Sequence, residues 1–388
     1  MSTRSIYLIA TEESGDRLGA ALMRALQARL GDGVNFLGIG GRAMTSEGIA
    51  SPFPIDELSI IGFAAVVKQL PMLMRRIREA ADAVLAAKPD LLVIIDSPDF
   101  THRVARRVRA KNPAVKIVNY VSPTVWAWRP GRAAKMRGYV DHVLALLPFE
   151  PEAHRRLGGP LCTYVGHPLI EQIATLRPDP REQMRRDASP FVLLVLPGSR
   201  RSETRHHMAV FGETLTKLRH DGLVFEAVLP TMPHLVEAVG EALKTWSVKP
   251  RIVIGEDDKR AAFRIAHAAL AKSGTVTLEL AISGVPMVTA YRGGAVEAYI
   301  AKRVVKLTSV ILANLVIGDN VIPEYLQVDC TASKLASALR DVLTDTPLRQ
   351  RQVAAFASLD AIMATGEVSP SAKAADVVVG MLIHAASS

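Results

Sequence analysis

Two short polar loops in this chain have the composition of anion-binding turns. Each follows an apolar run and leads into an amphipathic stretch, so backbone N–H groups and the positive end of a helix dipole face whatever binds above it. The first loop, between residues 6–10 and a helix predicted from Arg17, supplies Glu12, Ser14, Gly15 and Asp16. The second, after residues 268–271, supplies Ser273, Gly274 and Thr275, and Glu279 lies about one turn into the next helix. The pair predicts two α/β domains that face each other across a cleft.

The second loop has the groups that a nucleoside diphosphate needs. Its helix N-terminus offers donors for phosphate oxygens, and the Glu279 carboxylate can accept hydrogen bonds from ribose hydroxyls. A further loop, Gly198-Ser199-Arg200, resembles a phosphate cradle, because glycine lets the backbone approach closely and a guanidinium binds pyrophosphate oxygens bidentately. An ordinary tight turn with a solvated arginine is the alternative there. The GxxxxGKS/T pattern of a Walker loop is absent.

Asp96 is the strongest candidate for a general base. It ends the apolar run 91–95, and ligands of open parallel sheets bind beyond the carboxyl ends of the strands. Partial dehydration at such a position raises the pKa of a carboxylate towards a value useful for proton abstraction. The alternative is a helix N-cap, although Asp99 suits that role better. Other predicted strands are also followed by small or polar residues, namely Ser122, His167 and Gly198.

Composition sets limits on the class of protein. At 388 residues the chain exceeds the usual size of one core, and 49% apolar residues suffice for ordinary globular domains. Two cysteines cannot build a disulfide framework, which favours a reducing compartment. The N-terminal residues lack the pattern of a signal peptide, and no window approaches the ~20 apolar residues of a membrane span.

The net charge of +9 suits nucleic acid, an anionic membrane surface or phosphorylated ligands. We expect no nucleic-acid partner, because aromatic residues are only 5% and the basic residues are not interleaved with them. No HExxH, CxxC or clustered His/Asp pattern indicates a metal site, and no GxGxxG follows the first strand, so we expect no metal or other cofactor. The absence of a GxSxG motif around Ser14 argues against a nucleophilic serine.

Apolar runs alternate with amphipathic stretches, which is typical of parallel α/β units. The predicted strands are 6–10, 35–39, 91–96, 116–121, 142–147, 163–165, 191–196, 225–229, 251–254, 268–271 and 286–290. The predicted helices are 17–30, 63–87, 101–111, 151–157, 203–219, 233–245, 259–266 and 275–282. We expect two Rossmann-like doubly wound domains, 1–174 and 191–365, joined by a polar linker, 175–190. A C-terminal helix, 366–388, could pack back on the first domain.

Residues 60–77 form an unusually apolar segment with arginines at one end. A buried helix is one interpretation. The other is a surface for acyl chains and an anionic membrane, since apolar area next to cations suits such an interface. On that interpretation the contacting side chains are Val67, Leu70, Met72, Leu73 and Met74.

Taken in order, the motifs of this chain resemble the lipid A disaccharide synthase family, inverting glycosyltransferases of the GT-B architecture. The matching stretches are 12–16, Asp96-Ser97-Pro98-Asp99-Phe100, Tyr120-Val121-Ser122-Pro123-Thr124-Val125-Trp126-Ala127-Trp128-Arg129, 147–150, 165–168, 196–200, 273–279 and Asn314-Leu315. The Ser-Pro-x-Val-Trp-Ala-Trp-Arg run is the most specific of them. Thr11 departs from the family pattern, which usually has glycine there, so the shape of the first loop is open.

The resemblance implies UDP-2,3-diacylglucosamine as donor, 2,3-diacylglucosamine 1-phosphate as acceptor, and a β-1,6-linked disaccharide 1-phosphate plus UDP as products. Asp96 would be the catalytic base. The residues that it implies for the UDP site are Gly198, Ser199, Arg200, Ser273, Gly274, Thr275, Glu279 and Asn314. Those implied for the acceptor site are Glu12, Ser14, Gly15, Asp16, Ser122, Trp126 and His167. The enzyme would be cytoplasmic and peripheral on the anionic inner face of a Gram-negative inner membrane, and the resemblance leaves a homodimer open.

There are two alternatives, the first also an enzyme and the second from a different class of protein. One is another GT-B enzyme that uses a UDP-sugar, such as the lipid II-forming N-acetylglucosaminyltransferase or a UDP-GlcNAc epimerase, and the Trp-Ala-Trp-Arg run argues against both. The other is a two-domain protein that binds a nucleotide sugar or a lipid without turnover.

Overall fold

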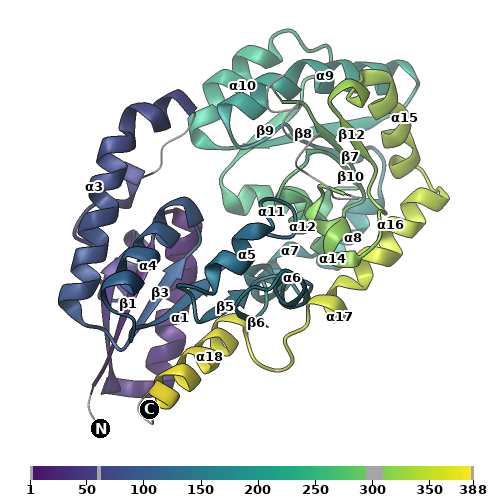
Figure 1. Ribbon diagram of the computed structural model, residues 1–388. Helices are drawn as coiled ribbons and strands as arrows, with labels where there is room; N and C mark the ends of the chain where they lie inside the picture. The colour runs from purple at the N-terminus through teal and green to yellow at the C-terminus, as the bar shows by residue number, and fades with distance from the viewer. Residues whose placement is uncertain (1–2, 59–62, 294–308, 386–388) are drawn as a thin grey trace. The chain divides into compact units, whose positions relative to one another are not determined.

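The computed structural model describes residues 3–58, 63–293 and 309–385, with side chains omitted at 63–68 and 384–385. The chain divides into two compact units (Figure 1). Unit 1 comprises residues 1–170 and 363–388, and unit 2 comprises residues 171–362. Each unit contains one six-stranded sheet in which every pair of neighbouring strands is parallel. The α/β class predicted from the sequence is confirmed.

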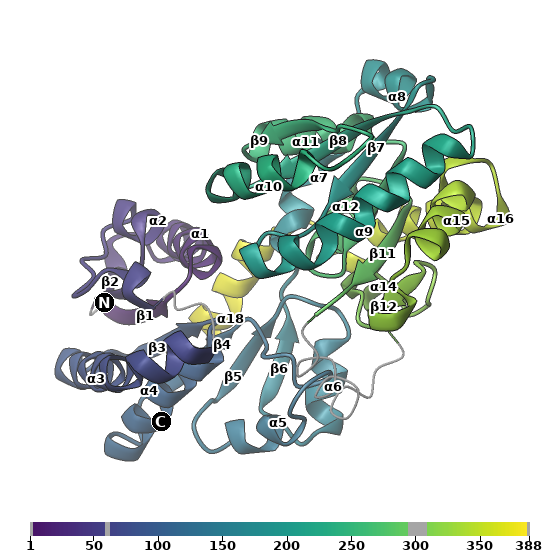
Figure 2. The ribbon, with the colours of Figure 1, turned by 90° about the horizontal axis from the view of Figure 1, so that it is seen from above.

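Unit 1 alternates strands and helices along the chain. Its elements are β1 (Arg4–Ala10), α1 (Glu13–Leu30), η1 (Gly31–Gly33), β2 (Val34–Ile39), α2 (Arg42–Ser46), η2 (Ile55–Leu58), α3 (Phe63–Ala87), β3 (Leu91–Ile95), α4 (Pro98–Lys111), β4 (Lys116–Tyr120), α5 (Gly131–Met136), β5 (His142–Ala145), α6 (Glu150–Arg156), β6 (Leu161–Tyr164) and the C-terminal α18 (Pro370–Ala385). Its sheet has the order β2-β1-β3-β4-β5-β6, which can be followed in Figure 2.

Both faces of this sheet are covered, which is why its strands are nearly continuous apolar runs. Alternate side chains of β1 point to opposite faces. Ile6 and Leu8 join a buried cluster with residues of α1 and α18, whereas Tyr7 and Ile9 join a second cluster with residues of α3, α4 and α5. The last helix of the chain therefore completes the core that the first helix begins.

Unit 2 repeats this construction. Its elements are η3 (Pro168–Gln172), which begins in unit 1, α7 (Ile173–Leu176), α8 (Pro180–Asp187), β7 (Phe191–Leu196), α9 (Arg201–His220), β8 (Phe225–Thr231), η4 (Pro233–Leu235), α10 (Val236–Leu243), β9 (Arg251–Ile254), α11 (Glu256–Ile265), β10 (Ala268–Lys272), α12 (Val276–Ile282), β11 (Met287–Tyr291), α14 (Leu312–Ile317), β12 (Glu324–Leu326), η5 (Gln327–Asp329), α15 (Ala332–Leu343), α16 (Pro347–Ala357) and α17 (Leu359–Met363), which ends in unit 1. The sheet order is β12-β11-β10-β7-β8-β9.

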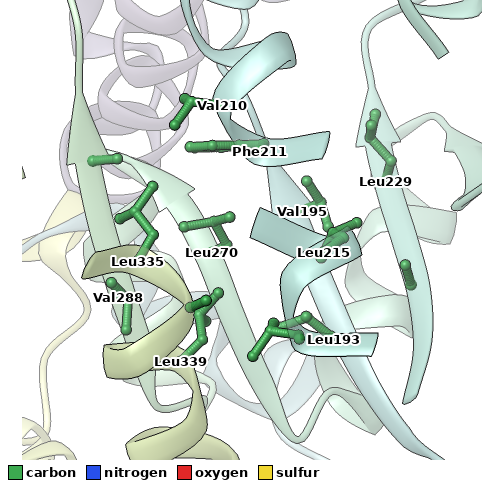
Figure 3. Packing of buried hydrophobic residues seen from close by; sticks show 14 of the residues in the cluster. Leu193, Val195, Val210, Phe211, Leu215, Leu229, Leu270, Val288, Leu335 and Leu339 are labelled. Carbon is green, nitrogen blue, oxygen red and sulfur yellow. The ribbon is translucent and has the colours of Figure 1, made fainter. Parts of the chain in front are cut away.

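One face of the second sheet packs against α9 and α15 (Figure 3). Leu193 and Leu270 of neighbouring strands meet Phe211 of α9 and Leu335 of α15, and all four are fully buried. Burial of such side chains stabilises a fold by roughly 1.5–3 kcal/mol each before the cost of ordering them. This cluster fixes α9, and with it the loop that precedes α9.

The strand order reverses direction once in each sheet. In unit 1 the reversal lies between β1 and β3, where Ala10 pairs with Ile95. In unit 2 it lies between β7 and β10, where Leu196 pairs with Ala271. At such a point the loops after the two strands diverge to opposite faces and leave a crevice for a ligand. These two positions are where the sequence places its candidate residues.

The elements that differ from the sequence-based predictions include the unpredicted short helices α2, α5 and α14 and three others. The helix α1 begins at Glu13 rather than Arg17, so the loop after β1 has only two residues. The short strand β12 was missed, because Glu324–Leu326 has three residues and no apolar run. The predicted linker 175–190 contains α8, which begins with a capping box formed by Asp179 and Glu182.

The helix α8 belongs to unit 2 and is held there by a buried arginine. The Arg186 guanidinium donates to the carbonyl oxygens of Phe263 at 3.0 Å and Ser283 at 3.0 Å, and its Nε donates to Arg264 at 3.1 Å. A helix anchored by a charged side chain has no apolar periodicity. That is the physical reason why the sequence pattern indicated a linker.

Candidate functional site

In unit 1, the loops after β1 and β3 meet at the reversal point of the sheet. Asp96 and Ser97 follow β3, and Glu12 precedes α1. The Ser97 hydroxyl donates a hydrogen bond to Glu12 Oε1 at 2.8 Å, which ties the two loops together. Asp96 therefore lies at the position that the sequence predicts, beside a second carboxylate.

The backbone at Asp96 and Ser97 is left-handed, with φ of 52° and 43°. Two consecutive non-glycine residues in this region cost of order 1–3 kcal/mol each, and such strain concentrates at functional sites. Two hydrogen bonds hold the conformation. The Asp96 N–H donates to Tyr120 O at 3.0 Å, and the Thr101 hydroxyl donates to Asp96 O at 2.6 Å. The Asp96 carboxylate is thus fixed by its backbone.

The surroundings of Asp96 favour its neutral form. Burial raises the pKa of Asp96 above its usual value, and the nearby Glu12 charge raises it further, while the Ser97 N–H partly opposes both. A carboxylate whose pKa is raised holds a proton more readily, which is the property of a general base.

The other residues predicted for the first loop are Ser14, Gly15 and Asp16, and all three lie in α1. Ser14 is exposed in the first turn of α1, and Gly15 is buried where a Cβ would lie 3.5 Å from Ala10 and from the Ile95 carbonyl. Asp16, 3% exposed, accepts hydrogen bonds from the N–H groups of Gly41, Ala43 and Met44 at 2.7, 2.8 and 3.0 Å. The structure therefore places Asp16 as the cap of α2, an interaction that the sequence analysis missed.

Ser122 and Trp126 lie in the loop after β4, and both contact α6. The Ser122 hydroxyl is 2.9 Å from His154 Nε2, and the Trp126 indole donates to Glu150 Oε1 at 3.1 Å. Ser122, Glu150 and His154 are all buried, at 4%, 3% and 0% exposure. Sequence analysis did not single out Glu150 or His154, although Glu150 falls in one of the motifs that carry the family resemblance.

His167 follows β6 by three residues. Its Nδ1 accepts a hydrogen bond from the Leu169 N–H at 3.2 Å. Burial lowers the pKa of His167 to about 4, so its imidazole is neutral at physiological pH and its proton is on Nε2. A neutral imidazole of this tautomer can donate one hydrogen bond through Nε2.

In unit 2, the loop after β7 closes around a glutamate that the sequence analysis missed. Glu203 Oε2 accepts from the Ser199 N–H at 3.2 Å, and Glu203 Oε1 accepts from Lys272 Nζ at 3.0 Å. Arg200 lies 3.5 Å from the same carboxylate. Gly198 has φ of 126°, and a Cβ there would lie 2.6 Å from the Glu203 side chain, so only glycine fits.

These contacts set the charge of the loop. Burial alone would raise the pKa of Glu203, but Lys272, Arg200 and the Ser199 N–H together lower it below the usual value. Glu203 is therefore ionised at neutral pH, and Lys272 and Arg200 neutralise it. The two cations are at the carboxyl ends of β7 and β10, the neighbouring strands at the reversal point.

His207 supports this loop from within α9. Its Nδ1 donates to Glu203 O at 2.7 Å, and its Nε2 accepts from the Arg292 N–H at 2.9 Å. Burial lowers the pKa of His207, so the ring stays neutral and can serve both partners.

The second loop predicted from the sequence lies in unit 2. Ser273 is buried, its N–H is bonded to Ala290 O at 2.9 Å, and Thr275 is exposed at the start of α12. Gly274 faces the Lys272 ammonium, 3.4 Å from where a Cβ would be. The Ser273 N–H is therefore not a free donor, contrary to the expectation for a helix N-terminus.

Glu279 is in α12, one turn after Thr275, and is paired with Lys259 of α11 at 3.2 Å. Both side chains are about one-fifth exposed, and Glu256 also contacts Lys259, at 3.0 Å. Asn314 is 2% exposed, and its amide is bonded to the backbone N–H and C=O of Ile322, both at 3.0 Å. Asn314 thus fixes the segment between α14 and β12.

Residues 63–77 of the apolar segment form the first half of α3, and residues 60–62 lie outside the described residues. Leu70 is 45% exposed, Met72 and Leu73 are half-buried, and the Val67 side chain lies outside the described residues. Met74 packs on the second core cluster of unit 1. In the described part of the chain, no helix is long and apolar enough to span a membrane, and no group of three or more His, Cys, Asp or Glu side chains could hold a metal ion.

We expect Asp16→Ala to lower the melting temperature of unit 1 by several degrees. The substitution leaves three backbone N–H groups without their acceptor, and an unsatisfied buried donor costs about 1–3 kcal/mol. Asp32→Ala, at an exposed position of η1, is the matched control and should melt like the wild type. Equal melting temperatures for both variants in differential scanning calorimetry would contradict the capping role.

The chain matches known proteins over nearly its whole length. The family of lipid-A-disaccharide synthetases matches residues 6–377. Lipid-A-disaccharide synthase of Rhodopseudomonas palustris (strain BisB18) is 70% identical over 385 residues, covering 99% of this chain and 97% of the relative. The synthase of Nitrobacter hamburgensis is 71% identical, covering 97% and 95%, and that of Rhodospirillum centenum is 42% identical, covering 97% and 94%.

Solved structures of low sequence identity share the fold. The S. aureus MnaA–UDP structure has a TM-score of 0.62 at 12% identity, covering 97% of this chain and 95% of that one. UDP-GlcNAc 2-epimerase from Neisseria meningitidis, bound to UDP-GlcNAc, has a TM-score of 0.63 at 11% identity, covering 98% and 100%. These likenesses show a common two-sheet GT-B architecture and nothing about substrate.

Proposed function

We propose a reaction on one premise: this chain belongs to the lipid-A-disaccharide synthase family. It is accordingly an enzyme of lipid A biosynthesis, a glycosyltransferase that forms the disaccharide. We propose that the donor is UDP-2,3-diacylglucosamine and the acceptor is 2,3-diacylglucosamine 1-phosphate. The products are then a β-1,6-linked disaccharide 1-phosphate and UDP.

Asp96 supplies the general base of this proposal. The 6-hydroxyl of the acceptor attacks the anomeric carbon of the donor, its proton passes to the Asp96 carboxylate, and the bond from that carbon to the UDP oxygen breaks. Attack opposite the leaving group inverts the anomeric configuration. The single observation that carries the proposal is the strained, half-buried Asp96 next to Glu12, at the reversal point of the sheet.

Unit 2 supplies the donor site of this proposal. The diphosphate takes Lys272 and Arg200 as partners in place of Glu203, and Ser199 and Gly198 let it approach the backbone closely. Glu279 accepts from the ribose hydroxyls, and the ion pair with Lys259 at 3.2 Å holds its carboxylate in place. Ser273, Gly274 and Thr275 form the wall of the site, and Asn314 fixes the neighbouring segment.

Purified protein with the two acylated sugars tests the function directly. We expect release of UDP and a product with the mass of the disaccharide 1-phosphate, detected by mass spectrometry. Binding of both ligands without turnover would favour a non-catalytic protein. A UDP-sugar of unchanged mass but altered configuration would favour an epimerase.

Asp96→Asn should preserve the fold and the affinity for UDP but lower turnover by roughly 10²–10⁴, the usual contribution of a general base. Asparagine tolerates the left-handed backbone of this position, so the loss reports the missing carboxylate. Asp99→Asn is the matched control, since its side chain is 82% exposed and three residues away. Turnover above about half of the wild-type rate in Asp96→Asn would remove Asp96 from the chemistry.

The pH profile gives a second measurement on the same residue. A base acts when deprotonated, so kcat should fall as pH drops through the raised pKa of Asp96. Glu12→Gln removes one of the charges that raise this pKa, while its amide oxygen can still accept from Ser97. We expect the acid limb of the profile to move to lower pH in that variant. An acid limb at unchanged pH would show that a group other than Asp96 causes it.

Glu279→Ala should weaken the binding of UDP by about 1.5–3 kcal/mol, the value of a hydrogen bond to a charged group. Glu256→Ala is the matched control, because Glu256 contacts the same Lys259 ammonium but is half exposed. Isothermal titration calorimetry with UDP measures both variants. Equal affinities in the two variants would exclude Glu279 from the ribose site.

We further propose that the first half of α3 docks on the anionic cytoplasmic face of the inner membrane. Leu70, Met72 and Leu73 supply apolar area. Arg75 supplies charge, because its side chain stays 62% exposed although it lies 3.5 Å from Glu79. Arg76 does not contribute, because it is bonded to Glu57 and Glu79 and covers the Phe53 ring. Met74 serves the core instead.

Leu70→Glu, alone and with Leu73→Glu, should abolish binding to anionic vesicles and change the melting temperature little. Activity on long-chain acceptors should fall more than activity on short-chain analogues. Val353→Glu is the matched control, since Val353 is 46% exposed on a helix of unit 2. Vesicle sedimentation measures binding. Wild-type vesicle binding by Leu70→Glu, or a large loss of its thermal stability, would support the interpretation of the segment as a buried helix.

A further inference from the structure

The loop 121–130 of unit 1 is long and irregular, yet hydrogen bonds and apolar packing both hold it in place. It begins directly after β4, next to the strand that carries Asp96, and the Asp96 N–H is bonded to the residue before it, Tyr120. Val125 is 1% exposed and anchors the loop in the apolar interior. The conformation of this loop therefore bears directly on the surroundings of the proposed base.

Two side chains of α6, Glu150 and His154, bind polar groups of the loop. Trp126 donates its indole N–H to Glu150 Oε1 at 3.1 Å, and its ring packs edge-on against Phe149 with centroids 5.2 Å apart. Glu150 Oε2 accepts from the Leu147 N–H at 3.0 Å. One carboxylate thus joins the loop after β4 to the loop after β5.

His154 and Ser122 extend this contact into a chain of hydrogen bonds. His154 Nδ1 is buried without a hydrogen-bond partner in the described part of the protein, and Gly159 lies against it. Since burial also lowers the pKa of His154, the imidazole is neutral and its proton is on Nε2, the nitrogen 2.9 Å from Ser122 Oγ. His154 therefore donates to Ser122, whose own hydroxyl donates to Pro123 O at 3.1 Å. Ser122 also favours the charged form of Glu150.

Glu150 is held among neutral groups. Burial raises the pKa of Glu150 to about 7, while hydrogen bonds from Trp126, the backbone of 146–147 and Ser122 favour its charged form. The nearby Cys162 on β6 has its own pKa raised by burial and by Glu150. No core packing requires a carboxylate here, and an apolar residue would be less costly to bury. The hydrogen bonds that the Glu150 carboxylate makes to the loop are therefore the reason to assign it a role in positioning that loop.

We infer that Glu150 is a positioning residue that, through Trp126 and Ser122, holds the loop 121–130 in the conformation that receives the acceptor sugar phosphate. This inference rests on the proposed glycosyl transfer. Glu150 and His154 do not touch the substrate; they fix the loop that does. When the fraction of molecules with a competent loop falls, the apparent affinity for the acceptor falls by the same factor.

Four variants test the inference. Glu150→Leu removes both acceptor oxygens, Trp126→Phe removes only the indole donor, and Glu150→Gln keeps one oxygen for the indole but loses the acceptor for Leu147. Glu152→Leu is the matched control in the same helix, because the Glu152 side chain is 62% exposed and pairs with Arg155. Initial rates at varied acceptor give KM and kcat, and calorimetry gives the affinity for UDP.

We expect Glu150→Leu and Trp126→Phe to raise the KM for the acceptor about tenfold, with kcat at saturating acceptor and UDP affinity unchanged. The double variant should be no worse than the worse single one, because both remove the same contact. Glu150→Gln should fall between the wild type and Glu150→Leu, and Glu152→Leu should behave as the wild type.

An unchanged acceptor KM in Trp126→Phe, or additive effects in the double variant, would overturn the inference. A loss of kcat at unchanged KM would also overturn it, since it would place these residues in the chemical step. If Glu150→Leu does not fold, Trp126→Phe and Ser122→Ala carry the test. Absence of disaccharide with the wild-type protein would instead refute the proposed function, so the two failures are distinct.

Discussion

The reversal of strand order in each parallel sheet is the constraint on which the rest of this structure depends. Because β1 pairs with β3, and β7 with β10, the loops that follow these strands lie side by side although they are far apart in the chain. Parallel pairing also buries both faces of each sheet, so polar groups can gather only at the strand ends. Asp96, Glu12 and Lys272 lie at or just beyond such ends, and Glu203 lies in the first turn of α9, against the loop after β7. The proposed site is therefore located by topology and not by any local motif.

Rigid packing around these strand ends offsets the backbone strain of the loops that follow them. The left-handed Asp96 and Ser97 are over-determined by hydrogen bonds from Thr101 and to Tyr120, and the helix that follows them is seated on a buried face of the sheet. The same principle applies in unit 2. The apolar cluster fixes α9, and only glycine fits at position 198, beside the Glu203 side chain. Side chains presented by such loops lose little further entropy when a ligand binds, which favours affinity and orientation.

The sequence predicted the apolar framework well and the polar contacts poorly, for a physical reason. Apolar runs of five or six residues bounded by small polar ones are a strong local signal, and every predicted strand has a counterpart. Arg186 and Asp16 acquire their roles from partners distant in the chain, and Glu203 is shared between the nearby Ser199 and the distant Lys272. Hydrophobic periodicity predicts none of these contacts. Glu150 lies in one of the motifs that carry the family resemblance, but its partners Trp126 and Ser122 follow a different strand, β4. The order of the strands was open for the same reason.

The charges of unit 2 suggest that binding of the donor is an exchange of partners rather than an addition. Lys272 and Arg200 already neutralise Glu203, whose carboxylate also accepts from the Ser199 backbone. A diphosphate that takes these cations leaves Glu203 with fewer partners, and that cost offsets part of the new attraction. The Lys272 ammonium has three donors, so it can serve phosphate and carboxylate together and soften the exchange. In the proposed donor site, an exchange of this kind would keep the affinity for UDP moderate, which suits an enzyme that must release UDP after every turnover.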